Sequence, residues 1–248
     1  MKKYGLIGYP LEHSFSKDYF NRKFAAEHID AEYANFEIKD VGELKNILRE
    51  NLSLCGLNVT LPYKTQIIPL LHGVDRDARM IGAVNVIKFI RGRFGKPKLK
   101  GFNTDVTGFR KSIEPLLNAT HSKALILGTG GASKAICHAL RQLHVTPVYV
   151  SRKTHGDGIT YDEITPKVIE QFTVIVNATP LGMYPHVERY PDIPYRLLTP
   201  DHILYDLIYN PGETLFMKKG RERGATVKNG LEMLILQACE SWTIWNSI

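Results

Sequence analysis

The sequence has fewer acidic than basic residues, and no long hydrophobic run. It contains 32 Lys and Arg against 25 Asp and Glu, giving a formal net charge of +7. The basic residues are scattered and form neither a continuous basic stretch nor a known nucleic-acid-binding module, so we expect no nucleic-acid partner. No run approaches the ~20 apolar residues of a membrane span, and residues 4–8 are too short for a signal-peptide core. We therefore expect a cytoplasmic protein with no membrane association.

Cysteine is also scarce. The three cysteines, Cys55, Cys137 and Cys239, are far apart in the 248-residue sequence. Their spacing matches no zinc or dithiol motif, which argues against a metal centre and against a disulfide scaffold. We expect reduced thiols and no metal ligands.

What the sequence does contain is a regular alternation of short apolar runs with segments of helical periodicity. Hydrophobic residues make up 44% of the chain and charged residues 23%, the balance of a globular protein. The alternation predicts an α/β protein with largely parallel sheets. The expected strands are residues 4–8, 32–38, 56–59, 79–90, 124–127, 147–150, 174–177 and 204–208. The expected helices are residues 16–28, capped by Ser16, then 41–49, 105–117, a helix ending near 143, and 231–245.

A glycine turn joins one of these strands to the next helix. It contains Gly128, Gly130, Gly131 and Ala132. Glycines permit a tight turn and close approach of the backbone, and the start of the helix presents free N–H groups to an anion. This context predicts a Rossmann-type site for a dinucleotide pyrophosphate; the alternative is a turn with no ligand.

The end of the following strand indicates which dinucleotide is bound. An NAD site of this type has an acidic residue there, which holds the ribose 2′-hydroxyl. This chain instead has Ser151, Arg152 and Lys153. The two cations suit the 2′-phosphate of NADP, so we expect NADP, although solvated charge at a strand end is the plainer alternative.

Several polar residues lie next to the ends of predicted strands in the N-terminal part of the chain. Asn58 and Thr60 alternate to one face of a strand end, with Lys64 just beyond. Any one of these residues is more often a turn or cap residue. As a set they predict a site for a small, polyhydroxylated ligand. The set is Ser14, Ser16, Asn58, Thr60, Lys64, Asn85, Asn103, Thr104 and Asp105.

The chain resembles the shikimate dehydrogenase family in motifs that run nearly from end to end. Two departures are Lys17, where the family usually has proline, and Ser151, where asparagine commonly precedes the arginine. The motifs are residues 13–16, 58–60 with Pro62 and Lys64, 82–85, 103–105, 128–132, 177–183, 206–211, and 229–233 with Gln237 and Ala238.

This resemblance implies the reversible NADPH-dependent reduction of 3-dehydroshikimate to shikimate, in aromatic amino-acid (chorismate) biosynthesis. It implies that Lys64 and Asp105 are the catalytic residues. The implied substrate-binding residues are Ser14, Ser16, Asn58, Thr60, Asn85, Tyr209 and Gln237. The implied cofactor contacts add Thr179, Met183 and Gly230 to the glycine turn and to residues 151–153. We expect residues 1–101 plus 230–248 to form the substrate-binding domain and residues 102–229 the Rossmann-type NADP domain.

Three alternatives stay open at this point. A quinate/shikimate dehydrogenase with broader substrate and cofactor use would share the fold. A methylene-tetrahydrofolate type of dehydrogenase would need a large aromatic slot, which the polar set fits poorly. A non-catalytic NADPH-binding regulator would share the fold too, but both Lys64 and Asp105 are present. The sequence leaves monomer and homodimer equally open.

Overall fold

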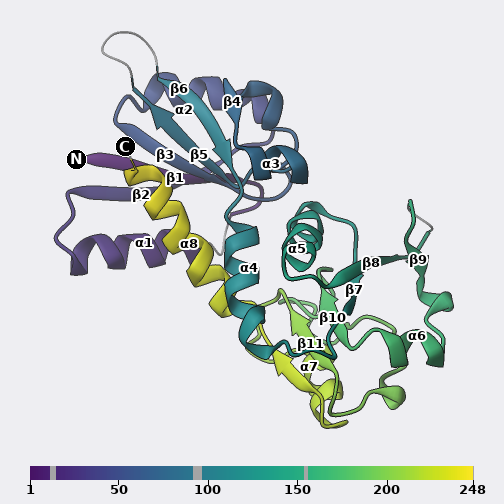
Figure 1. The fold of residues 1–248 in the computed structure, drawn as a ribbon. Helices are drawn as coiled ribbons and strands as arrows, with labels where there is room; N and C mark the ends of the chain where they lie inside the picture. The colour runs from purple at the N-terminus through teal and green to yellow at the C-terminus, as the bar shows by residue number, and fades with distance from the viewer. Residues whose placement is uncertain (12–14, 92–96, 154–155, 248) are drawn as a thin grey trace. The chain divides into compact units, whose positions relative to one another are not determined.

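The computed structural model describes residues 1–11, 15–91, 97–153 and 156–247. The chain forms two compact units (Figure 1). Unit 1 consists of Met1–Thr104 and Ala238–Ile248, and unit 2 of Asp105–Gln237. The last helix, α8 (Leu231–Asn246), contributes residues to both units.

Unit 1 is built on a six-stranded mixed sheet in the order β2-β1-β3-β5-β6-β4. β1 pairs in parallel with β2 and β3, whereas β5 is antiparallel to both β3 and β6. β4 and β6 are again parallel, so three of the five pairings are parallel, and the largely parallel sheet expected from the sequence is interrupted here by the antiparallel β5. The strands are β1 (Lys2–Gly8), β2 (Ala31–Glu37), β3 (Leu54–Val59), β4 (Gly73–Val74), β5 (Val86–Ile90) and β6 (Lys98–Phe102).

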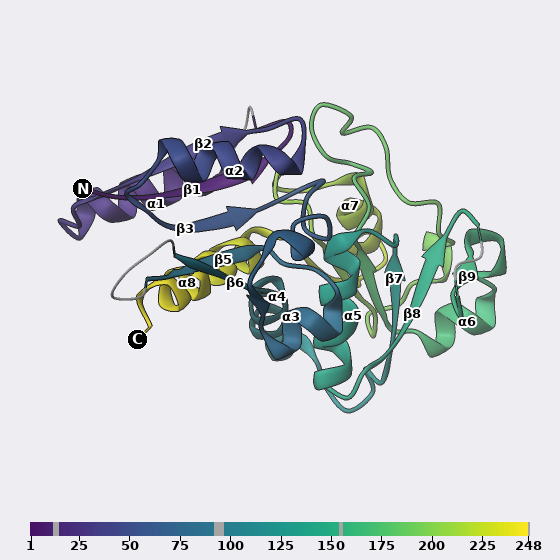
Figure 2. The same cartoon turned by 90° about the horizontal axis from the view of Figure 1, so that it is seen from above.

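Helices cover both faces of this sheet. α2 (Leu44–Glu50) packs through Leu44 and Ile47 on one face, together with the short 3-10 turns η1 (Val41–Glu43) and η2 (Ile68–Leu70). α1 (Phe15–Ala26) and the end of α8 pack on the other face, where Phe20, Tyr33 and Trp245 form part of an aromatic cluster. In Figure 2 the end of α8 lies beside β5, and Trp245 Nε1 donates to Ile87 O at 3.2 Å.

Unit 2 contains the all-parallel six-stranded sheet expected of a Rossmann-type domain, in the order β12-β11-β10-β7-β8-β9. Its strands are β7 (Lys123–Leu127), β8 (Thr146–Ser151), β9 (Ile159–Thr160), β10 (Val174–Asn177), β11 (Ile203–Asp206) and β12 (Thr226–Lys228). Its helices are α4 (Asp105–Ile113), α5 (Gly131–Gln142), α6 (Pro166–Gln171) and α7 (Leu215–Arg221), with 3-10 turns η3 (Glu114–Leu116), η4 (Tyr161–Glu163) and η5 (Tyr195–Leu197). The fold class predicted from the sequence is confirmed.

One predicted strand is wrong over part of its length. Residues 79–90 were expected to be extended, but α3 (Arg76–Ile81) occupies the first part and β5 only the second. The Asp75 side chain caps α3 by accepting from Asp77 N, and Gly82 ends it in the left-handed region at φ 69°. The tip of the predicted hairpin lies mostly at residues 92–96, outside the described residues.

Candidate active site

Asn58 is the centre of a buried polar network in unit 1. It is the fifth residue of β3, and 5% of it is exposed. Its Oδ1 accepts a hydrogen bond from the Tyr33 hydroxyl at 2.8 Å. Its Nδ2 donates to Asn85 O at 3.3 Å and to Ser241 Oγ at 3.1 Å. Both amide hydrogens are thus bound within the protein, which fixes the orientation of the side chain.

Asn85 is held by the residues just before α4. It lies immediately before β5 and is 3% exposed. Its Oδ1 accepts from Thr104 N at 2.7 Å, and its Nδ2 donates to Thr104 Oγ1 at 3.0 Å. Asn103 Nδ2 donates to Ala83 O at 3.0 Å in the adjoining turn. The structure therefore brings together Asn58, Asn85 and Thr104, three members of the polar set named from the sequence.

Ser16 joins the same network through a residue that the sequence analysis missed. The Ser16 side chain acts electrostatically on the hydroxyl of Tyr33, a side chain that is 2% exposed. Burial raises the pKa of Tyr33 well above its ordinary value, and the Ser16 side chain opposes this. Ser16 lies within α1, which begins at Phe15, so the expectation that it is the N-cap is wrong. Ser14 lies outside the described residues.

Lys64 and Thr60 follow the carboxyl end of β3, and both are partly buried. The Lys64 carbonyl accepts from Val84 N at 2.7 Å, and the Thr60 carbonyl accepts from Tyr63 N at 2.9 Å, so the backbone of this turn is fixed. Asp105 is the first residue of α4 and is 6% exposed. Lys64 belongs to unit 1 and Asp105 to unit 2.

The glycine turn of unit 2 has the geometry of an anion cradle. Gly128 follows β7 at φ 106°, and its N–H donates to Val150 O at 2.8 Å. A Cβ there would lie 3.1 Å from the Thr179 side chain and 3.2 Å from Ala178 O. Gly130 is the N-cap of α5, with no side-chain cap on the first N–H groups. Gly131 and Ala132 begin the helix, so small residues leave its start open to a phosphate.

The two cations lie at the end of β8, as expected. The Ser151 hydroxyl donates to Lys153 O at 2.5 Å and closes a turn around Arg152. Both Arg152 and Lys153 are exposed. Burial raises the pKa of the Tyr161 hydroxyl, and the nearby Arg152 opposes that shift. The turn thus presents positive charge beside the sheet of unit 2, and no carboxylate follows Ser151 directly in the sequence.

Three other predicted residues lie on loops at the carboxyl edge of the same sheet. Thr179 donates from its N and Oγ1 to Asn177 Oδ1, at 3.0 and 2.6 Å. Met183 is 49% exposed. Tyr209 is half-buried, and burial raises the pKa of its hydroxyl.

The remaining two predicted residues lie at α8. Gly230 immediately precedes this helix, and its N–H donates to Ile208 O at 3.0 Å. A Cβ on Gly230 would stand 2.1 Å from Leu207 O, so no other residue fits there without moving the backbone. Gln237 is 8% exposed and donates from Nε2 to Leu234 O at 3.0 Å.

Four side chains of these buried hydrogen-bond networks were not predicted as site residues from the sequence: Tyr33, Ser241, Asn177 and Asp206. Ser241 lies four residues after Gln237, on the same side of a helix, which is a signal the sequence offers. Asn177 and Asp206 end strands within motifs already recognised. Tyr33 had no such signal, because a tyrosine on the inward face of an alternating strand is typical of an ordinary core position.

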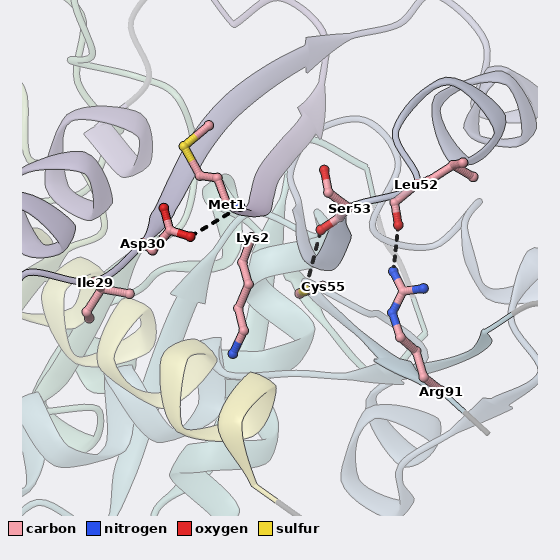
Figure 3. Close-up of a pocket in the computed structure, with 8 residues that line it drawn as sticks. All are labelled: Met1, Lys2, Ile29, Asp30, Leu52, Ser53, Cys55 and Arg91. Atoms are coloured by element: carbon pink, nitrogen blue, oxygen red, sulfur yellow. Dashed lines mark hydrogen bonds and ion pairs between the residues drawn. The ribbon is translucent and has the colours of Figure 1, made fainter. Parts of the chain in front are cut away.

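A surface cavity of about 500 Å³ lies elsewhere on unit 1 (Figure 3) and contains none of the predicted site residues. The Met1 ammonium pairs with Asp30 at 3.2 Å, and the Arg91 guanidinium donates to Leu52 O at 2.9 Å. The cavity is lined by Met1, Lys2, Ile29, Asp30, Leu52, Ser53, Cys55 and Arg91. Within the described residues we find no cluster of His, Cys, Asp or Glu able to hold a metal, and no helix long and apolar enough to cross a membrane.

Comparison with known proteins extends this description. The family model of the shikimate dehydrogenase substrate binding domain matches residues 6–87. The chain is 36% identical to the shikimate dehydrogenase (NADP(+)) of Methanosphaera stadtmanae over 97% of this chain and 90% of the relative. The crystal structure of shikimate dehydrogenase from Aquifex aeolicus has a TM-score of 0.86 and 36% identity, covering 99% of this chain and 92% of that one.

The same fold also occurs in a related enzyme. Quinate dehydrogenase from Corynebacterium glutamicum, solved in complex with NAD, has a TM-score of 0.86 but 28% identity, covering 100% of this chain and 94% of that one. Neither fold nor sequence identity alone separates the two activities, because identity to solved shikimate dehydrogenases ranges from 26% to 36%. With relatives aligned over nearly its whole length and a family model matching the region of Asn58 and Lys64, the chain belongs to the shikimate dehydrogenase family.

Proposed function

We propose that this protein catalyses the reversible NADPH-dependent reduction of 3-dehydroshikimate to shikimate, a step of aromatic amino-acid biosynthesis. The observation that carries the proposal is the buried Asn58–Asn85–Thr104 network, whose Asn58 and Asn85 lie within the residues that the substrate-binding family model matches. Pre-oriented amides next to a lysine suit a substrate that carries several hydroxyls and a carboxylate, since such groups need matched donors and acceptors.

In this proposal the residues of unit 1 hold the substrate. Ser14 and Ser16 bind its carboxylate, and Thr60, Asn85 and the Asn58 Oδ1 acceptor bind its hydroxyls. Tyr209 and Gln237 add further contacts to the substrate.

The chemistry of the proposed reaction requires a hydride at the carbonyl carbon and a proton at its oxygen. NADPH supplies the hydride when it is bound. The Lys64 ammonium stabilises the negative charge that develops on the oxygen and donates a proton to it. The Asp105 carboxylate accepts a hydrogen bond from a substrate hydroxyl and so orients the ring. In the oxidative direction the same groups act in reverse.

The residues of unit 2 fit NADP. The open start of α5, behind Gly128, Gly130, Gly131 and Ala132, suits the pyrophosphate. Arg152 and Lys153, with Ser151, suit the 2′-phosphate through charge-assisted hydrogen bonds. Thr179, Met183 and Gly230 lie on the loops proposed to contact the ribose and nicotinamide.

The test is a spectrophotometric assay that follows NADPH formation from NADP and shikimate, repeated with quinate and with NAD. Turnover of shikimate with NADP, and little with the other three pairs, is the expected result. Comparable turnover of quinate, or with NAD, would instead support the broader quinate/shikimate dehydrogenase. A folded protein that binds NADPH but turns over none of the four pairs would support a non-catalytic regulator and contradict the proposal.

A further inference from the structure

Asp206 is a completely buried carboxylate that none of the roles proposed so far uses. It is the last residue of β11 and has no exposed surface. Its Oδ1 accepts from Asn177 Nδ2 and from Ile208 N, both at 3.0 Å. Its Oδ2 accepts from the Thr214 hydroxyl at 2.6 Å. The carboxylate therefore links three separate points at the edge of the nucleotide sheet.

Asn177 extends this linkage to the neighbouring strand. It ends β10 and stands directly opposite Asp206 in the parallel register. Its Oδ1 accepts both hydrogen bonds of Thr179, and its Nδ2 also approaches Leu181 O at 3.3 Å. The amide thus holds the loop after β10, while Asp206 holds the loop after β11.

These two loops carry residues with proposed roles at the reaction centre. Thr179 is a proposed cofactor contact and is bonded to Asn177 directly. Ile208, whose N–H is bound by Asp206, precedes the proposed substrate contact Tyr209. The Ile208 carbonyl accepts from Gly230 N at 3.0 Å, so a third proposed contact is attached to the same backbone.

The chemistry of the Asp206 carboxylate indicates a role beyond filling space in the core. A buried carboxylate without a cation is costly to ionise, and no ion pair to Asp206 is found within the described residues. Burial raises its pKa to about 6, and the hydrogen bonds from Thr214, Ile208 and Asn177 oppose that shift. Burial raises the pKa of the Tyr195 hydroxyl, and the charges of Tyr190 and Asp206 add to that rise. Only a carboxylate offers acceptors on both oxygens, and three donors use them here.

We infer that Asp206 and Asn177 are positioning residues, which together fix the loops that carry Thr179 and Tyr209 for binding of the cofactor and substrate. The inference rests on the proposed function. It predicts that disturbing the pair weakens NADPH binding and raises KM even when the fold is retained.

The first test is to measure the NADPH dissociation constant by fluorescence titration, with kcat and KM, for Asp206→Asn. The amide cannot accept from Thr214 on its nitrogen, so we expect affinity to fall about 5- to 50-fold. Tyr205→Phe is the matched control, because it is the preceding residue of β11 and loses a buried hydrogen bond to Ser112 instead. Its NADPH affinity should stay within about twofold of wild type.

The second test exchanges the two groups. Asn177→Asp places two carboxylates against each other and should weaken NADPH binding more than Asp206→Asn does. The combined Asn177→Asp/Asp206→Asn variant restores one amide and one carboxylate, and should bind NADPH more tightly than Asn177→Asp alone. A mere loss of packing would not recover in this way.

Wild-type affinity and KM in folded Asp206→Asn would overturn the inference, as would an equal loss in Tyr205→Phe. If Asp206→Asn does not fold, Thr214→Val removes only one of the three hydrogen bonds, and its NADPH affinity should fall about 2- to 10-fold; unchanged affinity would overturn the inference equally. A wild type that binds NADPH but does not oxidise shikimate contradicts the proposed function alone. A wild type that does not bind NADPH contradicts both.

Discussion

The hydroxyl of Tyr33 on β2 reaches across β1 and donates a 2.8 Å hydrogen bond to Asn58 Oδ1 on β3. Burial raises the pKa of this hydroxyl and the Ser16 side chain opposes the rise, so Tyr33 acts on two proposed substrate-binding residues from different elements. Since the amide hydrogens of Asn58 are bound by Asn85 O and Ser241 Oγ, the Asn58 side chain is oriented before any substrate arrives. Preorganisation of this kind reduces the ordering cost of binding.

Tyr33→Phe should therefore weaken substrate binding without removing a group that contacts substrate. We expect KM for shikimate to rise about 3- to 20-fold, with a smaller change in kcat, because one buried hydrogen bond is worth about 1–2 kcal/mol. Steady-state kinetics with shikimate will measure both KM and kcat. Tyr4→Phe is the control, since Tyr4 belongs to the same aromatic cluster. An equal KM increase in both variants would show that the effect comes from packing.

Lys64→Ala should lower kcat far more than it raises KM. If the ammonium donates the proton, its loss should cost about 10²- to 10⁴-fold in kcat. Lys45→Ala, an exposed lysine on α2, provides the control and should keep wild-type kinetics. A large rise in KM with kcat nearly unchanged would assign Lys64 to substrate binding instead.

Arg152→Ser should reduce the preference for NADP over NAD. Losing a charge-assisted hydrogen bond to the 2′-phosphate is expected to raise KM for NADP about 10- to 100-fold, because such bonds contribute about 1.5–3 kcal/mol. KM for NAD, which lacks that phosphate, should change little. Arg196→Ala, an exposed arginine in η5 of the same unit, serves as the control. Equal changes with both dinucleotides would argue against a 2′-phosphate contact.

Asp206 should make the free energy of unfolding decrease as the pH rises. Burial raises its pKa from 3.8 to about 6 in the folded protein, so the folded state binds the proton more tightly than the unfolded state. The stabilisation is fully present below about pH 4 and is lost as pH rises through about 6, by on the order of 3 kcal/mol. Urea unfolding of wild type and Asp206→Asn across this range isolates the effect. A wild type that gains stability relative to Asp206→Asn as pH rises would contradict it.

Local sequence patterns determined most of the secondary structure of this protein and the position of its glycine turn. Apolar runs and helical periodicity located most strands and helices, and the turn after β7 was recognisable because glycines between a strand and a helix have few other uses. The charge at the end of β8 is equally local. Patterns failed where elements were short: α3 has six residues, α6 six and α7 seven, fewer than two turns of periodicity each.

The tertiary structure alone decided which polar groups meet. Alternation indicates that Tyr33 faces inward, but its partner Asn58 is 25 residues away, and the second partner of Asn58, Ser241, is 183 residues away. Asp206 and Asn177 likewise meet only because β10 and β11 pair in parallel and in register. Periodicity reports the burial of each residue along its own segment, whereas hydrogen-bond partners depend on how distant segments pack. That is why the sequence predicted the candidate site residues, and the structure revealed the residues that hold them in place.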